Sequence, residues 1–305
     1  MKRALVTGGT GYIGRALLRR LVESGVDTTA IVRPTSDRRL AAPARIIVDT
    51  GDVAYLAAGV QEAEPDVIFH LAAHTAVANA LSSVDPLVTS NVLFGTRLLE
   101  AASDRGRIRF VNTASYWQHA DGSPQYAPNT LYAATKQAFQ DILTFYVNRR
   151  DVAALTLRLS DVYGPNDPRR KLLPQLVDAQ AKGQVLKLSP GHQRIDLVHV
   201  DDVVSALIFA AELLARKPEL SGNAYSVASG RLRSIREVVA CVERVSGKPV
   251  AVEWGGIPFR PGEVMHPYLG DPLPNWHPSI DFDAALEEML TTVEHRELWR
   301  WTERS

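Results

Sequence analysis

Residues 7–14 read Thr-Gly-Gly-Thr-Gly-Tyr-Ile-Gly, and no other stretch limits the possible folds of this chain as much. They follow the apolar run at residues 4–6 and precede residues 15–22, whose apolar side chains recur at helical spacing. A strand, a glycine turn and a helix in this order are typical of a dinucleotide-binding βαβ unit. Glycines let the backbone approach a pyrophosphate, and the helix behind them offers unpaired N–H groups. The predicted cofactor contacts in this turn are Gly8, Gly11, Tyr12, Ile13 and Gly14.

Strand and helix patterns alternate through the first half of the chain. The expected strands after the first one are 28–32, 45–48, 66–70, 109–111 and 152–159. The expected helices between them are 53–63, 84–103 and 131–148. This alternation indicates an α/β fold, a doubly wound parallel sheet of the Rossmann type with helices on both faces.

Beyond residue 162 the expected elements become shorter and the loops longer. The segment 163–168 is rich in turn-forming residues, and six prolines fall between 258 and 278. The expected elements here are helices at 171–182, 202–215, 235–245 and from 283 onward, and extended segments at 195–200, 224–227 and 250–252. We therefore expect an NADP-binding Rossmann domain formed by 1–165 and 195–225. A smaller substrate lobe would comprise 166–194 and 226–305, with a ligand cleft between the two.

The overall charge and the cysteine content exclude several classes of protein. Lys plus Arg and Asp plus Glu are equal at 34 each, so no net field favours nucleic acid or an anionic membrane surface. The single cysteine, Cys241, cannot form an intramolecular disulfide and fits a reducing compartment. The sequence contains no apolar run long enough to cross a membrane. We expect a cytoplasmic protein that binds neither nucleic acid nor membrane.

A possible catalytic pair lies in the expected helix 131–148. Tyr132 and Lys136 are four residues apart, which places both side chains on one helix face. An ammonium group next to a phenol favours the phenolate and lowers its pKa, so Tyr132 is a candidate acid or base. Thr113 follows the expected fifth strand, at the edge of the sheet where ligands bind, and Ser115 is a second hydroxyl there.

These motifs together resemble those of extended short-chain dehydrogenases/reductases of the NAD-dependent epimerase/dehydratase family. The matching segments are the glycine turn, His70-Leu71-Ala72-Ala73, Asn91-Val92-x-x-Gly95-Thr96, Thr113, Tyr132-x-x-x-Lys136, Leu157-Arg158-Leu159, Tyr163-Gly164-Pro165 and Val198-His199-Val200-Asp201-Asp202. The match runs from residue 1 to about 290. The resemblance implies a nicotinamide cofactor, hydride transfer at a carbon of a nucleotide-diphosphate sugar, and Tyr132, Lys136 and Thr113 as catalytic residues. It also implies a homodimer that pairs the helices 84–103 and 131–148.

The end of the second expected strand indicates which cofactor is bound. An acidic residue at this position would accept from the ribose 2′-hydroxyl of NAD, but this chain has Arg33. A guanidinium pairs with a 2′-phosphate, so we expect NADP (NADPH) rather than NAD. The resemblance adds Asp49 and Thr50 near adenine, the backbone of Leu71, Ala72 and Ala73 beneath the diphosphate, and Lys136 on the nicotinamide ribose. His70 and His74 lack metal-ligand spacing, and no metal is expected.

The type of reaction follows from positions at which the chain differs from parts of the family. Sugar 4,6-dehydratases that resemble this chain have an Asp-Glu pair after the threonine, and here Ala114 and Ser115 stand there instead. Without carboxylates the elimination of water lacks its proton carriers. Cys241 lies among valines and is expected in a core rather than in an epimerising pair. Ketone reduction and 4-epimerisation both remain open.

Arg33 favours the reductase, and the segments 113–118, 132–139 and 163–169 resemble those of CDP-sugar 4-ketoreductases, the CDP-abequose and CDP-paratose synthases. We therefore expect NADPH-dependent reduction of a 4-keto group on a nucleotide-activated deoxy sugar, with a 4-epimerase as the alternative. A catalytically silent NADP-binding sensor is a further alternative, which the presence of the Tyr–Lys pair disfavours. The expected substrate contacts are Asn166, Arg169, Lys171, Arg194 and Arg260. Arg194 is the weakest of these, because it precedes Asp196 by two residues whereas the family arginine directly precedes the aspartate.

Overall fold

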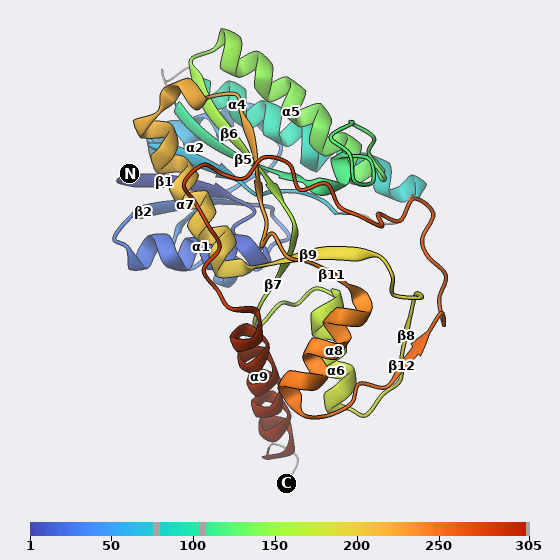
Figure 1. Cartoon of the computed structure of the whole chain (residues 1–305). Coiled ribbons are helices and arrows are strands. Elements are labelled where there is room, and N and C mark those ends of the chain that lie inside the picture. Colours follow the sequence, from blue (N-terminus) through green and yellow to red (C-terminus); the bar gives the residue numbers. More distant parts are fainter. Residues whose placement is uncertain (76–79, 104–107, 303–305) are drawn as a thin grey trace.

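A computed structural model describes residues 1–75, 80–103 and 108–302 of the chain, with side chains described up to residue 292. The central sheet has seven strands in the order β3-β2-β1-β4-β5-β6-β10, and every neighbouring pair is parallel (Figure 1). Its strands are β1 Arg3–Thr7, β2 Asp27–Val32, β3 Arg45–Val48, β4 Val67–His70, β5 Ile108–Ser115, β6 Val152–Leu159 and β10 Ala224–Val227. The order reverses between β1 and β4, as in a doubly wound sheet, which confirms the expected Rossmann class.

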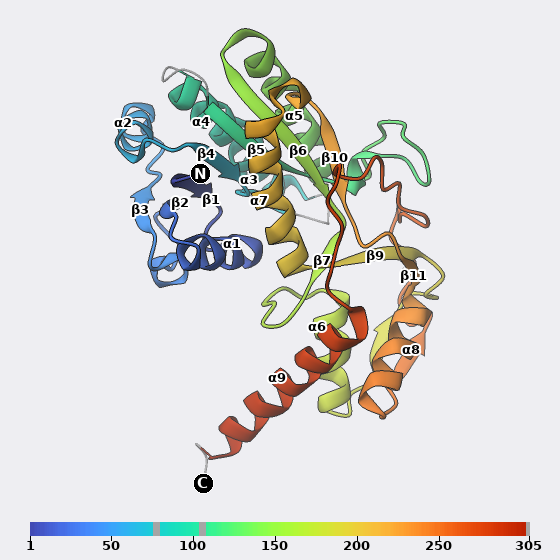
Figure 2. The same cartoon turned by 60° about the vertical axis from the view of Figure 1, so that its left-hand side comes forward.

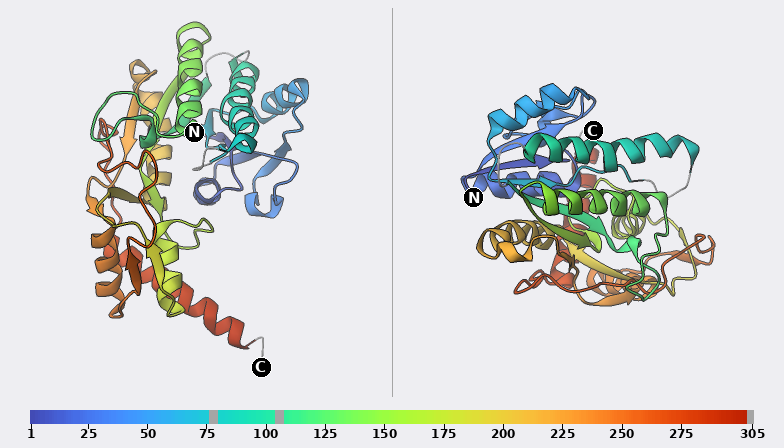
Figure 3. Two further views of the ribbon diagram at one scale, coloured as in Figure 1. Left: turned by 90° about the vertical axis from the view of Figure 1, so that its right-hand side faces the viewer. Right: turned by 90° about the horizontal axis from the view of Figure 1, so that it is seen from above.

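Helices cover both faces of this sheet, so its strands are almost continuously apolar. On one face lie α1 Tyr12–Glu23 and α7 Val200–Arg216, which contact each other. On the other lie α2 Val53–Ala63, α4 Phe94–Ser103 and α5 Leu131–Arg149 (Figures 2 and 3). Each face has its own cluster of buried side chains, with Leu17 and Leu207 in one, and Leu98 and Phe139 in the other.

The long helix expected at residues 84–103 is not uniform. It consists of α3 Val84–Val88, a π-helical turn at Thr89–Leu93 and then α4. The amide of Asn91, within the π turn, donates to the carbonyl oxygen of His74 (3.0 Å) and to the hydroxyl of Thr135 on α5 (2.9 Å). Since π turns often occur at functional sites, this contact between two helices points to the neighbouring stretch of α5.

Beyond β6, the elements other than α7 and β10 form a second half of the fold, which packs around a separate buried cluster that includes Leu176, Val238 and Leu286. Its helices are α6 Leu172–Ala181, α8 Ile235–Ser246 and α9 Phe282–Thr302, the last of which extends away from the body (Figure 1). Its strands are β7 Asp161–Tyr163, β8 Leu186–Leu188, β9 Arg194–His199, β11 Leu232–Ser234 and β12 Val252–Trp254. Short 3₁₀ turns occur at Arg38–Ala41, Leu81–Ser83, Tyr116–Gln118 and Pro218–Leu220.

Two small sheets in this half were not expected from the sequence. One has the order β11-β9-β7, and the other pairs β12 with β8. The strand expected at 250–252 lies two residues later, at Val252–Trp254, because this is where it pairs with β8 in parallel. No described helix combines the length and the apolar character that crossing a membrane requires.

Candidate active site

The glycine turn between β1 and α1 is tightly folded against the segment that follows β4. The amide of Gly11 donates to the carbonyl oxygen of Gly8 (2.9 Å), and a Cβ on Gly14 would overlap that same oxygen. Gly8 has φ +71°, and a Cβ there would lie 2.8 Å from the backbone nitrogen of Ala72. The expected diphosphate contacts of the turn and of residues 71–73 therefore lie side by side.

The N-terminus of α1 is open to a ligand. Gly11 occupies the N-cap position without a side-chain hydrogen bond, and the first turn contains no acidic residue. The first amides of the helix and its positive dipole end are thus available to an anion, and the turn borders a cavity. These features fit the pyrophosphate of a dinucleotide.

The residues expected to contact adenosine lie at the same edge of the sheet. Val32 pairs with Val48 in the register of β2 and β3. The next residues, Arg33 and Asp49, therefore lie beside each other. Arg33 is exposed, and Asp49 accepts from the amide of Gly51 (3.0 Å), next to Thr50. None of Arg33, Asp49 and Thr50 lines the cavity described below.

Tyr132 and Lys136 lie on the first turns of α5. The helix begins after Thr130, whose hydroxyl accepts from the amide of Ala133 (3.2 Å) and so caps the N-terminus. Both side chains line a cavity of about 460 Å³, which also borders Thr113 and the glycine turn. The structure therefore brings together the three expected catalytic residues and the expected cofactor turn.

The protonation of the pair differs in one respect from the expectation. Burial raises the pKa of Tyr132 to about 12, and the charge that opposes this rise is Arg169 rather than Lys136. Burial lowers the pKa of Lys136 to about 8, and the residue is only 3% exposed. Because desolvation disfavours both charged forms, Tyr132 is a protonated phenol at neutral pH, which suits a proton donor.

A chain of hydrogen bonds fixes Thr113 and the floor of the cofactor turn. The hydroxyl of Thr113 donates to the carbonyl oxygen of His70 (3.0 Å), which leaves its lone pairs to accept from a ligand. The ring of His70 bonds the hydroxyl of Thr7 (3.0 Å), and Thr7 accepts from the amide of Ala72 (3.1 Å). Burial lowers the pKa of His70 to about 3, so the ring is neutral, and it packs beside the rings of Phe110 and Phe139.

The cavity is lined by residues from the carboxyl ends of β1, β4, β5 and β6 and from the loop after β7. Besides the residues already named, they are Thr10, Ile13, Leu71, Ala73, Thr75, Ala114, Ser115, Tyr116, Trp117, Leu159, Ser160, Asp161, Val162, Pro168, Arg169 and Lys171. Ligands of open α/β sheets bind at this edge, and the volume suits part of a dinucleotide and a sugar. Tyr116, Ser160 and Asp161 were not expected in the site from the sequence, although each closely follows the end of a strand.

Asp161 forms a charged cluster in the wall of the cavity. Its carboxylate accepts from the ammonium of Lys171 (2.9 Å) and from the hydroxyl of Tyr116 (2.7 Å). Burial alone would raise the pKa of Asp161, but Lys171 and Tyr116 hold it below its ordinary value. Lys171, expected as a substrate contact, therefore reaches the cavity with its charge already paired.

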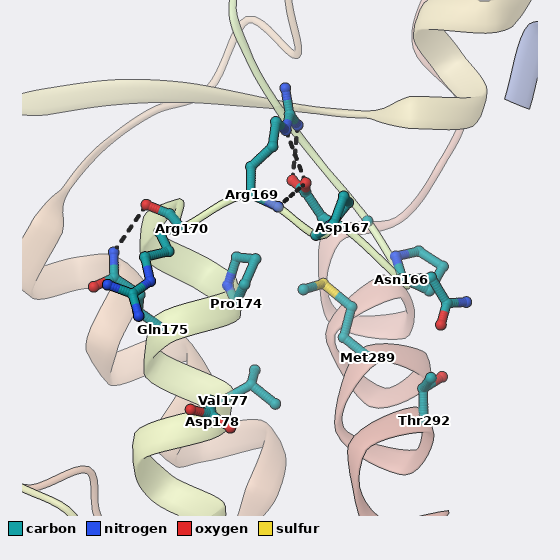
Figure 4. A pocket seen from close by; sticks show the side chains of 13 residues that line it. Asn166, Asp167, Arg169, Arg170, Pro174, Gln175, Val177, Asp178, Met289 and Thr292 are labelled. Carbon is teal, nitrogen blue, oxygen red and sulfur yellow. Dashed lines mark hydrogen bonds and ion pairs between the residues drawn. The ribbon is translucent and has the colours of Figure 1, made fainter. Parts of the chain in front are cut away.

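The other expected substrate residues are distributed over three places. Asn166 lines a hollow of about 270 Å³ between the loop 164–170, α6 and α9 (Figure 4), and Arg169 lines both this hollow and the cavity. A guanidinium nitrogen of Arg194 lies 3.9 Å from a carboxylate oxygen of Glu237, and one of Arg260 lies 4.0 Å from a carboxylate oxygen of Glu263. Both arginine side chains are exposed. Neither arginine borders the cavity, so their substrate role stays a prediction.

Comparison with known proteins places the chain in a family. The model of the NAD dependent epimerase/dehydratase family matches residues 4–228. The chain belongs to the NAD dependent epimerase/dehydratase family. This match confirms the family that the sequence motifs predicted. It also confirms the prediction of an NAD(P)-dependent enzyme of the oxidoreductase type.

Relatives within the family carry more than one activity. CDP-abequose synthase of Salmonella typhimurium is 30% identical over 94% of this chain and 96% of its own length. dTDP-L-rhamnose 4-epimerase of Burkholderia thailandensis is 26% identical over 96% and 95%. The crystal structure of UDP-glucose 4-epimerase of Thermus thermophilus in complex with NAD matches with a TM-score of 0.82 at 25% identity, covering 96% of this chain and 99% of that one. The expected likeness to CDP-abequose synthases is thus confirmed, and epimerases of the family are also similar.

Proposed function

We propose that the protein reduces the 4-keto group of a nucleotide-activated deoxy sugar with NADPH, and that Tyr132 donates the proton. The observation that carries the proposal is the shared cavity, in which Tyr132, Lys136 and Thr113 face the cofactor turn. The likeness to CDP-abequose synthase supports a nucleotide-sugar substrate. Ala114 and Ser115, in place of a carboxylate pair, disfavour a dehydratase.

In this reaction the bound cofactor supplies the hydride to the carbonyl carbon. Thr113, whose hydroxyl donates to the carbonyl oxygen of His70, accepts from a hydroxyl group of the sugar and so orients the ketone. The neutral phenol of Tyr132 transfers its proton to that oxygen as negative charge develops on it. Arg169 is the cation that favours the phenolate that remains. Lys136, one helical turn from Tyr132, would hold the nicotinamide ribose.

Arg33 supports NADPH as the cofactor, because an exposed guanidinium at the end of β2 suits a 2′-phosphate and offers no acceptor to a 2′-hydroxyl. The other expected contacts of the cofactor belong to the same proposal, from the glycine turn through Asp49, Thr50 and Leu71–Ala73. A related epimerase whose structure contains NAD supports the dinucleotide in general rather than the phosphorylated form.

The proposal extends to the division of the chain into domains and to its oligomeric state. We assign residues 1–165 and 195–225 to the cofactor domain, and 166–194 and 226–305 to the lobe that binds the nucleotide sugar. Arg194 and Arg260 would contact the diphosphate from that lobe. Exposed apolar side chains on the helical layer of α3 to α5, Val88, Leu93 and Phe145, support a homodimer through this layer.

A nucleotide-sugar 4-epimerase is the second candidate, because relatives of that activity match the chain over nearly its full length. In that case Tyr132 first removes a proton from the 4-hydroxyl, and the ketone is reduced again within the same cavity. The two candidates differ in the net consumption of reduced cofactor.

The test is a panel of 4-keto-6-deoxy nucleotide sugars, followed by absorbance at 340 nm with NADPH or NADH. We expect turnover with NADPH, a lower rate with NADH at equal concentration, and a Tyr132→Phe variant that still binds NADPH but loses about 10²-fold or more in kcat. Arg33→Asp should reverse the cofactor preference. Turnover by Tyr132→Phe at the wild-type rate would contradict the role of Tyr132. Binding of NADPH by a wild type that turns over no member of the panel would indicate a silent binding protein.

A further inference from the structure

The side chain of Tyr12 joins two parts of the active site that are far apart in sequence. Tyr12 is the first residue of α1, in the cofactor turn, and its hydroxyl donates to the carbonyl oxygen of Pro165 (3.2 Å). A Cβ on Gly164 would lie 2.8 Å from the same hydroxyl, so the loop 164–171 passes directly over the tyrosine. This loop carries Arg169 and Lys171 into the cavity on the substrate side.

A second contact fixes the loop to the ring of Tyr12. The guanidinium carbon of Arg169 lies 4.7 Å from the ring centroid, within the range of a cation–π contact. Arg169 cannot easily turn away, because Nε and one terminal nitrogen donate to the carboxylate of Asp167 (2.8 and 2.7 Å) and the latter also donates to the carbonyl oxygen of Val162 (2.9 Å). The side chain of Asp167 is fully buried.

The neighbouring arginine shows that this arrangement is specific. Figure 4 shows Arg169 rising from the loop away from α6 and α9 and paired with Asp167, whereas Arg170 lies beside Gln175 along α6. Arg169 lines both the active-site cavity and the neighbouring hollow, whereas Arg170 lines the hollow and not the cavity. The two arginines therefore form a matched pair for experiments, one on Tyr12 and one outside the site.

We propose that Tyr12 is a positioning residue that couples cofactor binding to the substrate side of the cavity, through its hydrogen bond to Pro165 and its stacking under Arg169. A dinucleotide on the turn restrains Tyr12, and Tyr12 then holds the loop 164–171 with Arg169 and Lys171 in place. By linkage, the cofactor strengthens binding of the nucleotide sugar by the same factor as the sugar strengthens binding of the cofactor. The part that concerns the sugar rests on the proposed function; the part that concerns the loop requires only a bound cofactor.

The first experiment is hydrogen–deuterium exchange of the intact chain with saturating NADP⁺, and separately with NAD⁺. In the wild type we expect the amides of 164–171 to exchange at least about fivefold more slowly with cofactor, the lower end of usual coupling factors. In Tyr12→Phe, which lacks the hydroxyl, and in Arg169→Lys, most of that protection should disappear at full occupancy. Arg170→Lys should retain it. Equal protection in Tyr12→Phe and the wild type would overturn the proposal.

The second experiment separates positioning from a general effect on folding. With NADPH saturating, Tyr12→Phe should raise KM for the sugar substrate about fivefold or more and leave kcat within about twofold, since Tyr132 and Thr113 are unchanged. A fall in kcat with KM unchanged would contradict the coupling. If the wild type turns over no member of the panel, the proposed function fails, and the exchange experiment alone decides the role of Tyr12.

Discussion

The buried phenol and ammonium on α5 define the chemistry at the scale of single residues. Burial raises the pKa of Tyr132 to about 12, so its phenol is a weaker acid than it would be in water. In the proposed reaction it therefore keeps its proton until a developing oxyanion accepts it. Lys136 is the reverse case, because burial lowers its pKa to about 8. Arg169, which also lines the cavity, is the cation that favours the charged form of Tyr132.

The buried Lys136 makes a prediction about stability. Its pKa is about 8 in the folded chain and 10.5 in the reference state, so between these values the unfolded chain binds more protons and stability rises with pH. Below pH 8 Lys136 is charged in both the folded and the unfolded chain, and the full cost of burying that charge lowers the stability of the fold. A pKa shift of this size lowers the free energy of unfolding by about 3 kcal/mol at most. Lys136→Met would remove this loss of stability at pH 7.

Urea unfolding of the free chain at pH 7 and pH 9.5 measures this effect. We expect Lys136→Met to be more stable than the wild type at pH 7, and its advantage to shrink to roughly half at pH 9.5. Lys182→Met, at an exposed ion pair on the surface, is the control and should show no such gain. An advantage that is independent of pH would mean that packing rather than charge is responsible.

At the scale of elements, the helical layer of α4 and α5 depends on one glycine. A Cβ on Gly95 would overlap the ring of Phe139, so Gly95 allows the two helices that position Tyr132 to approach closely. Gly95→Ala should destabilise the fold by about 1–3 kcal/mol, the usual range for overpacking. Thermal or urea unfolding measures the loss.

A double variant is the control for this contact. Gly95→Ala combined with Phe139→Leu should be less destabilised than the sum of the two single variants, because the shorter side chain vacates the space of the new methyl group. Additive losses would show that Gly95 matters for another reason, such as the end of the π turn.

The larger elements could be predicted from sequence, and the smaller ones could not. Apolar runs and helical spacing locate β1 to β6 and α1, α2 and α5, because each buries a face that its own pattern specifies. The three-residue strands β7, β8 and β11 form only because distant partners pair with them. The π turn at Thr89–Leu93 leaves no signal in the apolar pattern, which matches a continuous helix.

The same limit applies to the site. The helical spacing of Tyr132 and Lys136 and the position of Thr113 in a strand that ends at the ligand-binding edge predict that the three residues lie near one another, and all three line the cavity. The pairing of Asp161 with Lys171, and of Arg169 with Asp167, depends on how one loop folds back, which the sequence pattern does not specify.

At the scale of the whole molecule, the cavity lies where the parallel strands end and where the loop from the second half of the chain crosses them. Its walls come from segments as far apart as Gly8 and Lys171, so only the complete α/β sheet can assemble it. Two clusters of buried side chains stabilise the sheet and a third stabilises the second half. This arrangement places the proposed cofactor turn at the end of the central sheet and the proposed substrate contacts Arg169 and Lys171 on a loop.

The fate of the hydride tests the central claim most directly. The protein is incubated with a 4-keto-6-deoxy nucleotide sugar and NADPH deuterated at C4 of the nicotinamide, each C4 epimer in turn, and the product is analysed by mass spectrometry and NMR. The account predicts that, with one epimer, a single deuterium appears at C4 of the sugar and one NADPH is oxidised for each product formed. A product that forms without deuterium and without net oxidation of NADPH would contradict it.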